Sequence, residues 1–119
     1  MKHPRVMKHT QPHPVEHHPS FRAVIEAAPP VAELARETRD KDLLARLTIA
    51  CGDLVHGFAS PPGSQMRRAA HHRAWKGVRE LDRTLTAVRI NRMAPAKMIA
   101  RAQRAIDRAD VLIGALLPD

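Results

Sequence analysis

Two rows of basic side chains follow helical spacing in the second half of the chain. The residues with the type and spacing to bind phosphate are Arg68, Lys76, Arg79, Arg83, Lys97, Arg101, Arg104 and Arg108. Aligned cations bind polyanions because they release condensed counterions, and arginine can hold two phosphate oxygens at once. His72 lies in the first row and adds charge below about pH 6.5. The alternative is a solvated face that keeps the chain soluble.

The charge of the chain is concentrated on these two rows. The formal net charge is +8, and residues 64–108 contain 12 Lys and Arg but only 3 Asp and Glu. A localised positive field favours nucleic acids, acidic proteins or an anionic surface as partners. Neither row contains an aromatic residue for base stacking, so any nucleic-acid binding is expected to be phosphate-driven and poorly sequence-specific.

Other residues capable of chemistry lack the partners that a catalytic or metal site needs. The tail histidines are His3, His9, His13, His17 and His18. Imidazole can bind transition metals, but their spacing is irregular and no carboxylate or thiolate set accompanies them. A di-iron bundle requires Glu-x-x-His, which is absent, and Cys51 is expected to be an inert core residue. We therefore expect no enzyme activity, no metal and no cofactor.

Apolar residues at helical spacing predict the elements that position the basic rows. The stripes are Leu43, Leu47, Ala50, Leu54 and Phe58, then Ala74, Val78, Leu81, Leu85 and Val88, then Ile99, Ala102, Ile106, Ala109, Ile113 and Leu116. With a further helix before them, they predict an all-α, antiparallel, up-and-down four-helix bundle over residues 20–119. Its helices span about 20–39, 42–59, 64–92 and 95–117. Ser20 and Ser64 are expected to cap helices, and Pro29–Pro30 to kink or split the first.

The ends of the chain and its single cysteine suggest where the protein is found. Residues 1–19 contain four prolines and five histidines, and we expect an irregular tail there. The residues after Met1 do not resemble a secretory signal, and no apolar run is long enough to span a membrane. Cys51 cannot form a disulfide within the chain. These features predict a cytoplasmic protein.

Several apolar residues fall outside the core stripes and suggest an oligomer. Ile49, Trp75, Val111 and Leu112 are the candidate subunit-interface residues. Gly77 lies inside a predicted helix, where glycine costs about 1 kcal/mol of helix propensity relative to alanine. Close packing of another helix backbone against this position would explain why a glycine is found there. Glu80 is expected to form an ion pair within its helix, with a contact between subunits as the alternative.

Two segments carry a resemblance to a known family. They are Leu54–Gly57, at the end of one predicted helix, and Ala74–Leu81, with its Ala-x-x-Gly-x-x-Glu-Leu pattern. The layout from residue 42 to 117 resembles a bacterial four-helix-bundle family. That family includes proteins encoded in intervening sequences of ribosomal RNA genes and the accessory variability protein of diversity-generating retroelements. Val78 departs from its usual serine, and only Gly57 matches its Asn-Ile-Ala-Glu-Gly segment.

The resemblance implies a ring-like homopentamer with a basic surface and no catalytic activity. Some relatives bind nucleic acid or a reverse transcriptase. We therefore expect a non-enzymatic homo-oligomer that presents a basic surface to RNA or DNA, with a reverse transcriptase or another protein as a further partner and no membrane. The alternative is a structural or adaptor protein that binds an acidic protein and has no nucleic-acid role.

Overall fold

The structure, a computed structural model, describes residues 14–117 and is all-helical in this range, as predicted. Its helices are α2 (Pro14–His17), α3 (Pro19–Thr38), α4 (Asp42–Ala59), α5 (Gln65–Ile90) and α6 (Ala96–Gly114). The predicted tail histidines His3, His9 and His13, and Pro118, lie outside the described residues. None of the helices described combines the length and apolar content that a membrane span requires.

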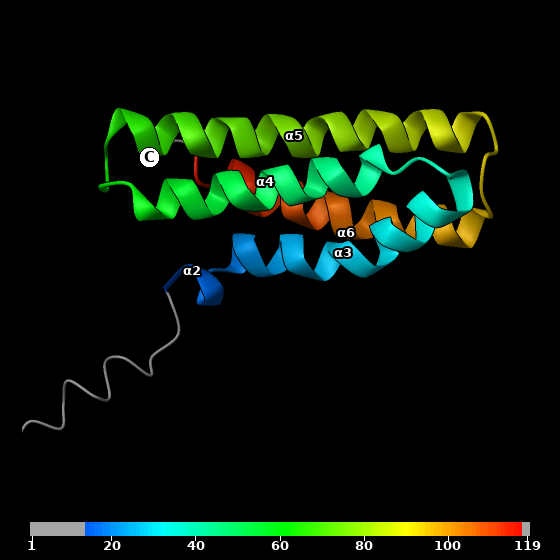
Figure 1. Ribbon diagram of the computed structural model, residues 1–119, viewed down its shortest axis with the longest axis horizontal. Helices are drawn as coiled ribbons and strands as arrows, with labels where there is room; N and C mark the ends of the chain where they lie inside the picture. The colour runs from blue at the N-terminus through cyan, green and yellow to red at the C-terminus, as the bar shows by residue number, and fades with distance from the viewer. Residues whose placement is uncertain (1–13, 118–119) are drawn as a thin grey trace, which may run out of the picture.

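The four long helices lie side by side (Figure 1). Helix α4 packs against α5, α5 against α6, α6 against α3, and α3 against α4. The colour in Figure 1 passes back and forth along the molecule from α3 to α6, so the α3–α4 and α5–α6 turns lie at the same end. The short helix α2 contacts α3 and α4.

The predicted apolar stripes form the core between these helices. Their buried members are Leu43, Leu47, Ala50, Leu54, Ala74, Val78, Leu81, Leu85, Val88, Ile99, Ala102, Ile106, Ala109 and Ile113. Phe58 and Leu116 are half-buried and pack against this cluster. Ala23, Val24, Ala27, Val31 and Leu34 complete it from α3. The spacing of three and four residues therefore identified the inner face of each long helix.

Helix α3 continues through Pro29 and Pro30, so of the two predicted outcomes, a kink or a split, the split does not occur. The residues on either side of the two prolines explain this, because Ala27 and Val31 are completely buried on the same face. Pro29 is exposed and Pro30 is half-buried, so their rings lie away from the centre of the core. The turns after the prolines are inclined to the first turns in Figure 1, as expected where proline rings displace the preceding carbonyls.

Two helix starts differ from the prediction. His18, not Ser20, caps α3, and its Nδ1 accepts the Ser20 backbone N–H at 3.2 Å. Pro19 occupies the first turn, where a missing N–H costs nothing. Residues 14–17, expected to be irregular, form α2. Ser64 caps α5 as predicted, with its hydroxyl accepting the Arg67 N–H at 3.1 Å.

Candidate nucleic-acid interface

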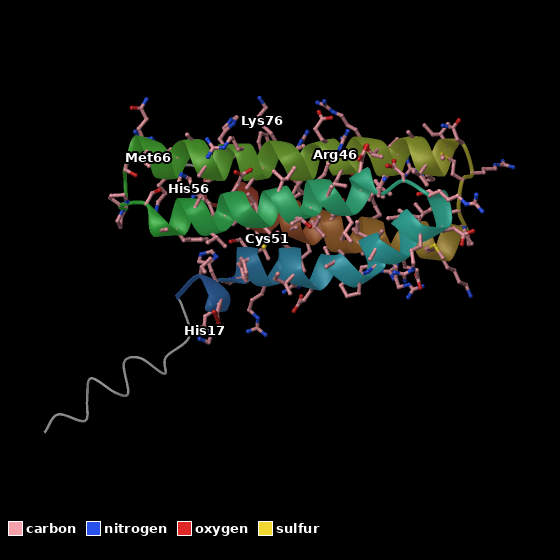
Figure 2. The ribbon with its side chains drawn as sticks, viewed as in Figure 1. His17, Arg46, Cys51, His56, Met66 and Lys76 are labelled. Atoms are coloured by element: carbon pink, nitrogen blue, oxygen red, sulfur yellow. The ribbon has the colours of Figure 1, made fainter. Side chains whose placement is uncertain are left out.

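All eight predicted phosphate-binding side chains lie on the surface of α5 and α6. Arg68, Lys76, Arg79, Arg83, Lys97, Arg101, Arg104 and Arg108 are each exposed. Figure 2 shows Lys76 pointing away from the other helices. The core stripe of each helix lies on the opposite side, because a helix turns about 100° per residue. The eight cations therefore lie on the outer face of their helices, as the spacing predicted.

Four of these eight side chains already have a partner within the chain. Arg79 lies 3.8 Å from Asp110, Arg83 lies 2.8 Å from Glu80, and Arg101 lies 2.9 Å from Glu33. The Arg68 guanidinium donates to the Gly63 carbonyl at 2.6 Å. By contrast, Lys76, Lys97, Arg104 and Arg108 form no side-chain hydrogen bond or ion pair within residues 14–117. These four cations are the ones available to a polyanion.

Four ion pairs among the described residues join different helices, and one of them links Arg73 of α5 to Asp53 of α4 at 3.4 Å. The Arg79–Asp110 pair connects α5 with α6, and the Arg101–Glu33 pair connects α6 with α3. Glu80 forms the predicted pair within α5 and also lies 3.7 Å from Arg46 of α4. Figure 2 shows Arg46 at the border between α4 and α5. At least one side chain of each pair is substantially exposed, so each pair is worth only about 0–1 kcal/mol.

A groove of about 600 Å³ lies at the turn between α5 and α6. Its basic and polar lining residues are Arg89, Arg92, Arg104 and Gln103, and its apolar lining residues are Ala94, Ala96, Ile99 and Ala100. Arg89 and Arg92, like Arg104, have no side-chain partner among the described residues. We call this feature the α5–α6 groove.

Sequence reasoning missed Arg89 and Arg92 because neither continues the spacing of the basic rows. The available signal was the absence of acidic residues between Asp82 and Asp107, a stretch with six basic residues. These two carboxylates do not line the α5–α6 groove. Both accept hydrogen bonds from the Gln103 side-chain nitrogen, at 2.6 Å and 2.8 Å respectively.

Comparison of the chain with models of known protein families, with curated proteins and with solved structures finds no match. The resemblance described above therefore depends on two short segments. One of its residues has a structural reason within this chain: a Cβ added to Gly57 would lie 2.6 Å from Nε2 of the buried His71. Gly77 has no such reason, because an added Cβ would meet only the Ala50 Cβ, at 3.7 Å. Within this chain, no backbone atom of another helix lies within 4 Å of a Cβ added to Gly77, so the close approach that would justify this glycine is not found here.

The four candidate interface residues do not form one patch in a single chain. Ile49 is 65% exposed on α4 and Val111 is 70% exposed on α6, two helices that do not contact each other. Trp75 and Leu112 are half-buried and pack against the core. The Trp75 ring lies beside Gly114 of α6, and the Arg79 guanidinium lies over it at 5.0 Å. Trp75 thus covers the edge between α5 and α6, which leaves Ile49 and Val111 as exposed apolar side chains.

Cys51 and His18 are partly buried and pack against apolar neighbours. Burial raises the pKa of the Cys51 thiol, which lies between α4 and α3 (Figure 2). Burial lowers the pKa of His18, whose ring contacts Phe58 at 4.6 Å between centroids. No three His, Cys, Asp or Glu side chains in residues 14–117 gather at one point.

Proposed function

We propose that the chain is a non-enzymatic, cytoplasmic protein with an antiparallel, up-and-down four-helix bundle that binds RNA or DNA. The observation that carries this proposal is the acid-free stretch between Asp82 and Asp107, which turns from α5 into α6. Of its six cations, Arg89, Arg92, Lys97 and Arg104 have no side-chain partner among the described residues. Phosphates can bind these groups without first breaking an internal ion pair.

The same surface supports recognition of the nucleic-acid backbone rather than of bases. Trp75 is the sole aromatic residue of α5 and α6, and it packs between Arg79 and Gly114. Without an exposed aromatic ring, the surface has no platform on which unpaired bases can stack. Binding should therefore depend strongly on salt and weakly on sequence.

We further propose that the protein is a homo-oligomer, and a pentamer if the family resemblance holds. The exposed side chains of Ile49 and Val111 support self-association, because each is a large apolar group without a partner in the single chain. Ile49 lines a shallow groove between α4 and α5 with Arg46, Gly77 and Glu80. Each added subunit would repeat the basic surface around the assembly and strengthen its field.

Fluorescence anisotropy with labelled RNA and DNA of about 20 nucleotides tests the nucleic-acid proposal. We expect binding at about 50 mM salt that weakens by more than tenfold at about 200 mM salt. The double variant Lys97→Glu, Arg104→Glu should lose most of this affinity. Its matched control is Arg36→Glu, Arg39→Glu at the end of α3, which changes the net charge equally, lies outside the two basic rows and the α5–α6 groove, and should retain affinity within about threefold. Arg79 is unsuitable because a glutamate there would face Asp110.

The proposal fails if the wild-type chain binds neither nucleic acid at about 50 mM salt. It also fails if the α3 control loses as much affinity as the α6 variant, because general charge would then explain binding. Binding of an acidic protein by a chain that binds neither RNA nor DNA would favour the adaptor alternative. Circular dichroism of both double variants verifies that their helices are intact.

A further inference from the structure

The backbone of Arg92 adopts a left-handed conformation that ordinarily favours glycine. Its φ is 52°, and among the described residues other than glycine only Arg39 shares a positive φ. The Met93 N–H donates to the Val88 carbonyl at 3.0 Å, and the Arg92 N–H donates to the Arg89 carbonyl at 3.2 Å. These bonds end α5 in the turn where glycine is the usual residue. Strain of this kind often marks a functional position.

The side chain of Arg92 lines the α5–α6 groove together with Arg89 and Arg104. Three guanidinium groups exceed the single negative charge of a phosphodiester. A phosphate at the end of a strand carries about −1.5 to −2 at pH 7 and presents three acceptor oxygens, so it matches this cluster better. The first N–H groups of α6 lie at the same turn and have no side-chain cap.

The rest of the groove can accept the nucleoside attached to such a phosphate. Ala94, Ala96, Ile99 and Ala100 supply an apolar surface beside the three arginines. The groove volume of about 600 Å³ lies within the range of small-ligand sites. None of the residues that line the groove is acidic; Asp82 and Asp107 accept hydrogen bonds from the lining residue Gln103 but do not themselves line the groove.

We propose that the α5–α6 groove binds the terminal phosphomonoester of a nucleic-acid strand. Arg89, Arg92 and Arg104 contact the phosphate, and the apolar surface contacts the terminal nucleoside. This inference rests on the proposed function, because it assigns a specific part of the strand to one part of the basic surface. It adds a preference for phosphorylated ends that a uniform basic face would not have.

The test compares three labelled strands of one sequence, which end in a 5′-phosphate, a 3′-phosphate or hydroxyl groups alone. We expect the wild-type chain to bind at least one phosphorylated strand about five- to tenfold more tightly than the hydroxyl strand. The variant Arg92→Gly should abolish this ratio. Glycine is well suited to the left-handed turn, so this variant removes the guanidinium without threatening the end of α5.

Arg39→Gly is the matched control, because Arg39 also has a positive φ, of 58°, and ends α3 outside the groove. This control should keep the preference for phosphate. Equal affinity for all three strands overturns the inference but leaves nucleic-acid binding intact. Loss of the preference in both glycine variants also overturns it. If no strand binds at about 50 mM salt, the proposed function itself has failed.

Discussion

Replacement of Gly77 by alanine tests how α5 packs in the intact protein. Gly77 lies inside α5, where glycine costs about 1 kcal/mol relative to alanine. The added Cβ would meet the Ala50 Cβ at 3.7 Å, an ordinary van der Waals distance. No packing penalty then offsets the gain in helix propensity. We expect Gly77→Ala to raise the free energy of unfolding by about 0.5–1 kcal/mol and Tm by about 2–5 °C.

Gly57→Ala is the matched change with the opposite expected sign. It gains a similar helix propensity, but its Cβ would lie 2.6 Å from Nε2 of His71. His71 is 2% exposed and packs against Phe58, with 4.8 Å between ring centroids, so it has little room to move. Overpacking costs about 1–3 kcal/mol, which exceeds the gain of about 1 kcal/mol in propensity. The net effect should be a loss of stability.

Urea and thermal unfolding, followed by far-ultraviolet circular dichroism at two protein concentrations, measure both variants. A stability loss in Gly77→Ala would refute the reasoning from a single chain. It would mean that another backbone lies against Gly77. The groove shared by Gly77 and Ile49 would then lie within a subunit contact, and the loss should grow where the protein is assembled. Sedimentation of the variant would verify whether the oligomer has dissociated.

Two further predictions concern helix ends. Burial lowers the pKa of His18, so its contribution to stability is present above about pH 6.5 and is lost as pH falls toward the lowered value. His18→Asn keeps a side-chain acceptor that caps α3 but does not titrate. Between about pH 6.5 and 5, the urea midpoint of this variant should fall less than that of the wild type. Equal falls would show that titration of His18 does not set the pH dependence of stability. Arg92→Gly and Arg39→Gly should each raise the free energy of unfolding by about 0.5–1 kcal/mol, because each relieves a left-handed residue. A lower urea midpoint in either variant would show that the arginine side chain stabilises the turn.

The inner faces of the helices could be predicted because burial depends on a repeating pattern within one helix. Val78, Leu81 and Leu85 are completely buried, as their spacing indicated. The continuity of α3 at Pro29–Pro30, where a kink or a split was predicted, could not be decided in this way. Local backbone preference opposes it, and burial of Ala27 and Val31 on a shared face overrides that preference. Helix ends likewise depend on single side chains such as His18.

The basic face of the candidate site could be predicted from the sequence. The ion pairs that neutralise some of its arginines within the chain could not. Arg101 and Glu33 are far apart in the sequence, and only the packing of α6 on α3 brings them together. The α5–α6 groove escaped prediction for a related reason. Arg89 lines the groove but does not continue the spacing of the basic row on α5, and Arg92 lies beyond the end of α5. Turns collect side chains that helical periodicity does not relate.

The two prolines within α3 also affect which surfaces can be covered by a partner. Proline has no N–H, so the carbonyls of Ile25 and Glu26 lack their usual donors four residues later. Both residues are exposed, so water can satisfy these carbonyls. A subunit that covered this stretch would remove that water at a cost of about 1–3 kcal/mol for each unpaired carbonyl. The proposed self-association should therefore avoid the middle of α3, even though Ile25 offers an exposed apolar side chain there.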